Sequence, residues 1–386
     1  MRDCPHIPEL KYSEFSRRLR GGASADERLP ISGGVELTAR CNLRCAHCYV
    51  NEPLSARGDL EAEVSERILS EIADAGCLWL LLTGGEPLVR EDFPRLYRFA
   101  KNKGFLITLF TNATLVTPEH AALLKDLKPF RVEVTVYGAT EQTYERVTRV
   151  RGSFRQCLKG ISRLAAALQP DPPTGPSSGP GTAPNGSRLC LKTMALSLNA
   201  HELKGIERLA QEHGAIFRYD PLVMGRIDGK EGPRRVRMSP ADVLAVDMAD
   251  PRRVREWVKA REQFRGPLRE SDRVFQCGGG VNTFFVEAKG RLVMCPVARS
   301  WGYDLTRGTF QEGWAQARRA RRGMMRTRPS PCATCHLAGL CGQCPGWGET
   351  EHGDPEARVE YLCRIAHLRA DYLERLSPIR KGGRTS

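Results

Sequence analysis

Residues 35–53 read VELTARCNLRCAHCYVNEP and place three cysteines, Cys41, Cys45 and Cys48, in the spacing Cx3Cx2C. Three thiolates on one 4Fe-4S cluster leave the fourth iron open for an outside ligand, which is typical of a catalytic centre. A closed structural zinc site would need four ligands close together. The apolar run 34–38 predicts a buried strand. The cysteines then lie on the loop at its carboxyl end, which is the catalytic edge of α/β barrels.

The next apolar run of the chain ends in a glycine-rich motif, Thr83-Gly84-Gly85-Glu86-Pro87. Two adjacent glycines let the backbone approach a ligand closely, and the proline fixes the turn. The carboxylate of Glu86 suits an ammonium group. A turn of purely structural use is the alternative. The glycine-rich motif follows the cysteine loop and lies at the end of a second strand. This position favours a binding site shared by the two motifs.

Together the two motifs resemble those of the radical S-adenosylmethionine (radical SAM) enzymes. The resemblance implies that Cys41, Cys45 and Cys48 are catalytic and hold a 4Fe-4S cluster whose open iron binds the amino and carboxylate groups of S-adenosylmethionine. It also implies that one electron, from a donor such as flavodoxin or ferredoxin, splits this cofactor to give a 5'-deoxyadenosyl radical that abstracts hydrogen.

Further cofactor contacts are implied by the resemblance alone. His47 corresponds to an aromatic ring near the adenine, and the motif at 83–87 corresponds to the loop for the methionine amino group, through Gly84, Gly85, Glu86 and Pro87. Polar side chains at strand ends correspond to contacts with the ribose or carboxylate: Thr111, Asn112 and Asn199.

At one further position the sequence departs from the family pattern, and at another the sequence does not decide which residue matches it. The carboxylate usual at the fourth strand end is absent, because residues 135–138 read TVYG. An arginine that grips the cofactor carboxylate is expected before Gly152, and the sequence leaves three candidates: Arg146, Arg149 and Arg151.

Between residues 63 and 223, amphipathic stretches alternate with short apolar runs, as in βα units. The expected strands are 34–40, 78–83, 105–111, 131–137, 189–196 and 215–223, and the expected helices are 63–75, 92–103, 118–127, 153–168 and 201–213. A full eightfold barrel needs about 250 residues. The expected fold class is therefore α/β, with a partial (β/α)6 TIM-type barrel that the resemblance implies is open on one side, followed by a small cysteine-rich domain with a β-hairpin and helices.

Composition narrows the class of protein. The chain has 386 residues, a formal net charge of +14 and 14 cysteines. Ligand-like cysteine spacings suit a reducing compartment and argue against a disulfide scaffold. Without an apolar signal region or a run long enough to span a bilayer, we expect a cytoplasmic protein with no membrane association. The excess of basic over acidic residues suits an acidic partner, either a nucleic acid or an acidic peptide.

The densest basic run is expected on a helix after Trp314. A solvated basic face is its plain interpretation, and a docking surface for an acidic peptide segment is the alternative. The run comprises Arg318, Arg319, Arg321, Arg322, Arg326 and Arg328.

The expected domains follow shifts in composition. A polar extension, 1–33, precedes the barrel at 34–223, and a bridge at 224–276 with one helix, 240–263, leads to a cysteine-rich domain at 277–366 and a basic C-terminal helix and tail at 367–386. Residues 170–187 contain six prolines and four glycines. This composition predicts a disordered insertion, which we expect to be catalytically silent because αβ loops lie opposite the catalytic edge.

Seven cysteines fall in the last third of the chain, in the pattern Cx12Gx4C, Cx2Cx5Cx2C and one final cysteine: Cys277, Cys295, Cys332, Cys335, Cys341, Cys344 and Cys363. A turn at Gly290 between two apolar runs predicts a hairpin. A zinc ribbon is the alternative. Seven cysteines, however, are more than one zinc site needs and one fewer than two sites need.

This pattern resembles the SPASM domain, an extension of radical SAM enzymes that holds two auxiliary iron-sulfur clusters. The resemblance implies a distal cluster on Cys332, Cys335, Cys341 and Cys363. It implies a cluster nearer the barrel on Cys277, Cys295 and Cys344, with one ligand missing. In the sulfatase-maturing branch of this family, an aspartate directly follows the hairpin cysteine and serves as a base, whereas this chain has Pro296 there.

The two resemblances therefore imply a radical SAM oxidoreductase that abstracts hydrogen from a peptide or protein side chain. Members of the SPASM group mature ribosomally made peptides by crosslinking, thioether formation or oxidation. Oxidation of a small molecule, such as a sugar alcohol or tetrapyrrole precursor, is the alternative. Nucleic-acid modification ranks lower because no known module for it is recognisable, and a protein with purely structural clusters is a further class. A separate leader-binding protein is expected if a leader peptide is recognised.

Overall fold

The computed structural model describes residues 29–50, 58–169, 186–263 and 272–376. Most of the expected N-terminal extension, most of the insertion at 170–187 and the end of the C-terminal tail lie outside the described residues. Within them, one nine-stranded sheet has the order β6-β5-β4-β3-β2-β1-β7-β8-β9.

Six parallel strands carry the first half of the chain: β1 (Ser32–Glu36), β2 (Trp79–Thr83), β3 (Leu106–Thr111), β4 (Arg131–Thr135), β5 (Leu189–Met194) and β6 (Ile216–Asp220). Each strand pairs with the next along the chain. This order follows from a helix after each of the first five strands, because a parallel pair needs a crossover connection. The expected α/β fold with six strands of a partial barrel is confirmed.

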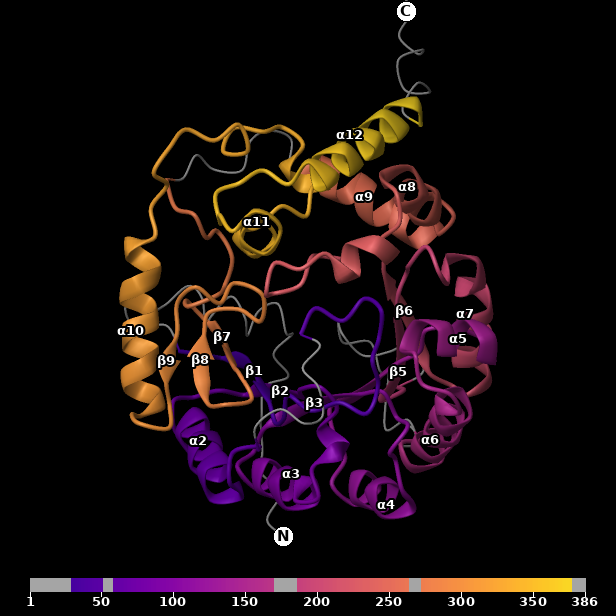
Figure 1. The fold of residues 1–386 in the computed structure, drawn as a ribbon, viewed down its shortest axis with the longest axis vertical. Helices are drawn as coiled ribbons and strands as arrows, with labels where there is room; N and C mark the ends of the chain where they lie inside the picture. The colour runs from indigo at the N-terminus through magenta and orange to yellow at the C-terminus, as the bar shows by residue number, and fades with distance from the viewer. Residues whose placement is uncertain (1–28, 51–57, 170–185, 264–271, 377–386) are drawn as a thin grey trace, which may run out of the picture.

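The helices of this half lie outside the curved sheet (Figure 1) and are α2 (Ala62–Asp74), α3 (Phe93–Asn102), α4 (Pro118–Asp126), α5 (Glu141–Thr148), α6 (Ser153–Ala167) and α7 (Leu203–Glu212). Alternate strand residues are fully buried beneath them, as Ile107, Leu109, Val132 and Val134 illustrate. The side chains between these positions point to the concave face. Short 3-10 turns, η1 (Pro87–Val89) and η2 (Ala200–Glu202), follow β2 and β5.

The expected hairpin around Gly290 is present and extends the barrel sheet. It consists of β7 (Thr283–Val286) and β8 (Arg291–Val293), and β8 pairs with a short β9 (Tyr303–Asp304). Strand β7 also pairs in parallel with β1, with Val286 opposite Val35. The cysteine-rich part therefore begins as a continuation of the barrel sheet at β1 (Figure 1).

The bridge contains two helices, so the expectation of one helix over 240–263 was wrong. The bridge starts with a 3-10 turn, η3 (Gly232–Val236). Two helices follow it, α8 (Pro240–Met248) and α9 (Pro251–Gln263). Proline has no N–H for a helix interior but is favoured in the first turn. Pro251 therefore divides the segment.

The remaining elements are α10 (Phe310–Gly323), η4 (Ala338–Leu340), α11 (Pro345–His352) and α12 (Glu360–Arg375). Helix α12 begins before the boundary expected at 367 and packs on α8, where Arg369 Nη2 lies 2.5 Å from Asp247 Oδ2. The last helix thereby joins the bridge to the cysteine-rich part. Among the described residues, every helix is too short or too polar to cross a bilayer.

Candidate functional site

The cysteine loop and the glycine motif are joined through their backbones. Gly85 N donates a hydrogen bond to Thr38 O at 2.8 Å, and Glu86 N donates one to Arg40 O at 2.9 Å. A Cβ at Gly84 would collide with Thr38 O, and one at Gly85 would collide with Arg40 O. Gly84 also has a positive φ of 153°. Both glycines are therefore required for the close approach of the two loops.

Glu86 links the carboxyl ends of β2 and β3. Its fully buried carboxylate accepts hydrogen bonds from Thr111 Oγ1 at 2.7 Å, Asn112 N at 2.6 Å and Leu88 N at 3.2 Å. Burial raises the pKa of Glu86 to about 7, and the three donors oppose this rise. A carboxylate has about four lone-pair positions, so roughly one is left for an ammonium group. Thr111, expected at the cofactor, here binds Glu86.

We call Cys41, Cys45 and Cys48 the loop group. Burial raises the pKa of Cys41 to about 12 and raises that of Cys45 well above its ordinary value, and charge on Cys48 raises both further. Asn112 donates from Nδ2 to Cys41 Sγ at 4.0 Å. Cys48 N donates a hydrogen bond to Cys45 O at 3.1 Å, so the second and third cysteines lie on one tight turn of this loop. Iron would hold them as thiolates against these shifts.

Helix α5, which the sequence analysis missed, supports the loop group. Arg44 N and Ala46 N of the cysteine loop donate to Thr148 O at 3.0 Å and Val147 O at 2.9 Å. A detectable signal was present, because Thr140 caps the helix by accepting from Thr143 N at 3.3 Å. Threonine is a favoured N-cap residue.

The three candidate arginines follow or belong to this helix. Arg146 Nη2 donates to Leu198 O at 2.5 Å. Arg149 adopts the left-handed conformation with φ of 59°, and its charge lowers the pKa of Cys45, against the dominant effect of burial. Arg151 is exposed. Of the three arginines, Arg149 is therefore the one whose charge acts on the loop group.

His47 and Asn199 have contrasting surroundings. The His47 ring packs edge-on against Tyr137, with 4.5 Å between centroids, and its buried Nδ1 has no hydrogen-bond partner. Burial lowers the pKa of His47 to about 4, so the ring is neutral. Asn199 is fully buried, and its amide binds the backbone at Leu196 N, Tyr137 O and Met194 O. Its observed role is to tie two strand-end loops together.

The concave face of the barrel carries a charged group that the sequence analysis missed. Lys192 Nζ on β5 lies 3.4 Å from Glu133 Oε2 on β4, and Arg218 Nη1 on β6 lies 3.3 Å from Glu133 Oε1. Lys192 Nζ also lies over the Phe110 ring, 2.8 Å from its centroid. The available signal was a lysine inside the otherwise apolar run LCLKTM, since buried strands seldom carry charge.

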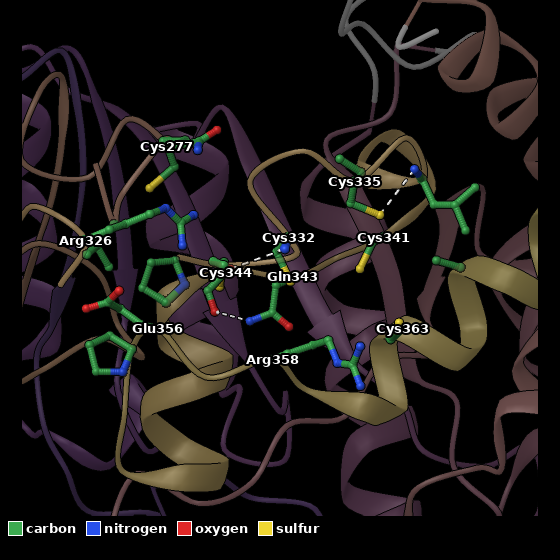
Figure 2. A pocket seen from close by; sticks show the side chains of 18 of the residues that line it. Cys277, Arg326, Cys332, Cys335, Cys341, Gln343, Cys344, Glu356, Arg358 and Cys363 are labelled. Atoms are coloured by element: carbon green, nitrogen blue, oxygen red, sulfur yellow. Dashed lines mark hydrogen bonds between the residues drawn. The ribbon is translucent and has the colours of Figure 1, made fainter. Parts of the chain in front are cut away.

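Six of the seven C-terminal cysteines line one cavity of about 290 Å³. In Figure 2, Cys277 and Cys344 lie on one side of it, and Cys335, Cys341 and Cys363 lie on the other. Arg326 lies beside Cys277 in the same view. The cavity lies between residues 274–277, which precede the hairpin, and the first turns of α12.

These cysteines form two electrostatic groups. We call Cys277, Cys295 and Cys344 the near group, because burial raises the pKa of Cys344 and charge on the other two raises it further. We call the second set the distal group: Cys332, Cys335, Cys341 and Cys363. Burial raises the pKa of Cys341 to about 11, and charge on the other three members raises it further. The grouping matches the ligand sets that the SPASM resemblance implies.

The thiol groups suit clusters better than single ions. Within the described ranges, no three His, Cys, Asp or Glu side chains are close enough to share one metal ion. Each thiolate of a four-iron cluster binds a different iron, so cluster ligands need not converge on one point. Three separate groups of soft thiol donors fit iron-sulfur clusters. Cys77, Cys157 and Cys190 are buried in the core, as expected of small apolar side chains.

The fold and the loop group together define an α/β partial barrel with a thiol-rich loop at the carboxyl edge of its sheet. Residues 35–174 match the family model described as Radical SAM superfamily. The chain thus carries a radical SAM domain, which implies a 4Fe-4S cluster and S-adenosylmethionine. The matched range contains the loop group and the motif at 83–87.

Similar proteins extend the likeness over most of the chain. The AdoMet-dependent heme synthase of Methanosarcina barkeri is 24% identical over 347 residues, or 83% of this chain and 92% of the relative. The mycofactocin maturase MftC of Mycobacterium ulcerans is 27% identical over 331 residues, or 82% and 80%. The structure of Streptococcus suis SuiB bound to precursor peptide SuiA has a TM-score of 0.65 at 15% identity, covering 86% of this chain and 76% of SuiB. The last match shows a shared fold.

Proposed function

We propose that this protein is a radical SAM oxidoreductase that abstracts hydrogen from a peptide side chain and thereby matures a ribosomally made peptide. The loop group would hold the cluster that binds S-adenosylmethionine, and the near and distal groups would hold two auxiliary clusters. When bound, the loop-group cluster supplies the electron that splits S-adenosylmethionine and so initiates hydrogen abstraction.

The chain's own residues would orient the cofactor. Glu86 stiffens the loop at 83–87, whose backbone is pinned to the cysteine loop, so the ammonium group meets a rigid edge. Arg149, the arginine that acts on Cys45, would pair with the cofactor carboxylate. The neutral ring of His47, held by Tyr137, would stack near the adenine.

The observation that carries the peptide assignment is the likeness to mycofactocin maturase MftC. It extends over 331 residues, far beyond the radical SAM match at 35–174. A likeness of this length includes cysteine-rich sequence as well as the barrel. A peptide substrate, low-potential electron delivery by a flavodoxin or ferredoxin, and a separate leader-binding protein where a leader is recognised are parts of the same proposal.

A tetrapyrrole substrate is the second candidate. It is favoured by the similarity to the AdoMet-dependent heme synthase, which covers 83% of this chain. The two candidates share the radical chemistry and differ in the molecule from which hydrogen is taken.

Anaerobic reconstitution tests the proposal. We expect roughly twelve irons per chain from three four-iron clusters, and 5'-deoxyadenosine from S-adenosylmethionine under a low-potential reductant. Changing Cys41, Cys45 and Cys48 together to Ala should remove one cluster and abolish 5'-deoxyadenosine, whereas Cys77→Ala should retain both. About four irons in the wild type would refute the auxiliary clusters, and cleavage by the triple variant would refute the loop-group assignment.

Substrate class is tested by mass spectrometry. The peptide from a short open reading frame adjacent to the gene should lose hydrogen or gain a crosslink in the presence of enzyme, cofactor and reductant. An iron-containing or metal-free porphyrin precursor with propionate side chains serves as the parallel substrate. Conversion of the porphyrin alone would replace the peptide assignment with the second candidate.

A further inference from the structure

Arg321 is a buried cation at the near group. It lies in the last turn of α10 and is 5% exposed. Its Nε donates to Gly279 O at 2.8 Å, and its Nη2 donates to Cys277 O at 3.0 Å. These two bonds hold the backbone that carries the first cysteine of the near group. This placement overturns the expectation of a solvated basic face for Arg321.

The third guanidinium nitrogen has no partner. Nη1 of Arg321 is buried and makes no hydrogen bond within the described protein. Buried polar groups nearly always have a partner, and a buried cation without one is costly. An anionic acceptor near Cys277 would satisfy both the donor and the charge. An iron-sulfur cluster with thiolate ligands supplies such an acceptor, because its sulfurs carry negative charge.

Neighbouring residues restrict the position of the Arg321 side chain. The Arg321 guanidinium carbon lies 5.5 Å from the centroid of the Phe275 ring. A Cβ at Gly280, which has a positive φ of 69°, would lie 3.4 Å from Arg321 Cβ. That spacing is an ordinary van der Waals contact, so α10 packs directly on the loop that carries Cys277, and the positive φ is the reason that glycine suits this position. Because the side chain is buried, water screens its charge only weakly.

We propose that Arg321 raises the reduction potential of the cluster held by the near group, acting through its charge and not as a ligand. The inference rests on the proposed auxiliary clusters. Reduction adds one electron to the cluster and leaves its bonds and those of Arg321 intact. The added negative charge is stabilised by the adjacent guanidinium, and hydrogen bonds and net charge are known determinants of cluster potential.

The test is a redox titration of the reconstituted full chain, monitored by electron paramagnetic resonance with dithionite as reductant. The signal that Cys277→Ala abolishes identifies the near-group cluster. Arg321→Gln should lower its potential by about 59 mV, a tenfold change in the reduction equilibrium for a one-electron couple. Arg321→Lys keeps the charge and should stay closer to wild type. Arg319→Gln changes an exposed arginine of the same helix and should have no effect.

The outcomes separate charge from structure. If Arg321→Gln keeps the near cluster at a lowered potential and Arg321→Lys stays close to the wild-type potential, the charge sets the potential and the proposal stands. An unchanged potential in a fully loaded Arg321→Gln variant, equal shifts in the Gln and Lys variants, or loss of the cluster from both would overturn it. About four irons in the wild type would instead show that the auxiliary-cluster assignment itself fails.

Discussion

Arg299 and Glu36 form an ion pair, with 3.0 Å between Arg299 Nη2 and Glu36 Oε1. Glu36 ends β1, five residues before Cys41, and Arg299 follows Cys295 by four. A second ion pair joins Arg299 Nη1 to Glu287 Oε1 at 3.0 Å. One arginine thereby ties β1, the strand that leads to the loop group, to the hairpin that leads to Cys295.

Breaking this link should destabilise the protein. Arg299→Gln leaves the buried Glu36 carboxylate without its cation, whereas Glu287 keeps Arg291 Nη1 at 3.7 Å. Removing one partner of a buried pair costs roughly 3 kcal/mol. We expect a clearly lower melting temperature for the reconstituted protein. The double variant Glu36→Gln/Arg299→Gln should recover part of the loss, because one buried charge is gone.

Arg307→Gln is the matched control for Arg299→Gln. The Arg307 side chain is 89% exposed and lies 3.8 Å from Asp304. Exposed pairs contribute little, so its melting temperature should equal that of the wild type. Equal stability of the Arg299→Gln and Arg307→Gln variants would contradict the structural role of the Arg299–Glu36 pair.

The fold was predictable where local pattern decides it. Short apolar runs between amphipathic stretches identified all six barrel strands, and the Gly290 turn identified the hairpin, because both signals lie within a few residues. The pairing of β7 with β1 was not predictable, since residues 286 and 35 meet only in the folded chain. Pro251 was visible in the sequence, and its effect on a helix interior was overlooked.

The site was predictable to the extent that cysteine spacing defines it. The sequence gives no direct view of what a polar side chain binds after folding. Thr111 and Asn199 were assigned to the cofactor, whereas their hydrogen bonds go to Glu86 and to strand-end backbone. Arg321 looked like one more residue of a basic run. Its burial depends on which face of α10 meets Gly280, and that is a tertiary contact.

Lys192 should impose a pH dependence on stability. Burial lowers its pKa from 10.5 to about 8, and the Glu133 carboxylate only partly opposes this. Below pH 8 the lysine is charged in both the folded and the unfolded state. Burying the charged ammonium group then lowers the free energy of unfolding by its full amount. Between about pH 8 and 10.5 the unfolded chain binds more protons, so stability rises with pH, by up to roughly 3 kcal/mol.

Melting temperatures measured anaerobically from pH 7 to 10.5 test this dependence. The difference between wild type and Lys192→Met should change in favour of the wild type across that window. Lys159→Met replaces an exposed lysine, and its difference from wild type should stay flat. A flat difference for Lys192→Met as well would show that Lys192 titrates normally.

Pro296 predicts that the enzyme does not make formylglycine. In the sulfatase-maturing branch an aspartate at this position accepts a proton, and proline has no group that can do so. The Pro296 carbonyl oxygen is itself engaged, accepting a hydrogen bond from Arg299 Nε at 2.7 Å. Incubation with a sulfatase-type Cys or Ser peptide should therefore leave that residue unchanged by mass spectrometry, while a sulfatase-maturing enzyme converts it in the same assay. Detection of formylglycine would refute this.

The three cysteines of the near group predict an interaction with a substrate thiol. A four-iron cluster held by Cys277, Cys295 and Cys344 would have one iron without a cysteine ligand, and residues 278–283 read GGGVNT, with no thiol, imidazole or carboxylate. Gly279 is close-packed against the hairpin, where a Cβ would lie 3.1 Å from Met294 O. The remaining iron would then suit an external thiolate, whose pKa iron would lower. Cys4, an Asp or Glu from elsewhere in the chain, or water are the alternative ligands.

If that iron faces the barrel mouth, a thiolate bound to it would lie near a substrate carbon radical, and thioether formation would be the favoured chemistry. Titrating the reconstituted enzyme with a cysteine-containing substrate peptide should perturb the electron paramagnetic resonance signal that Cys277→Ala removes. The matching Cys→Ser peptide should bind but perturb this signal less, because a hydroxyl is a poorer ligand for iron than a thiolate. Identical spectra with both peptides, at concentrations where each is shown to bind, would exclude ligation by the substrate thiol.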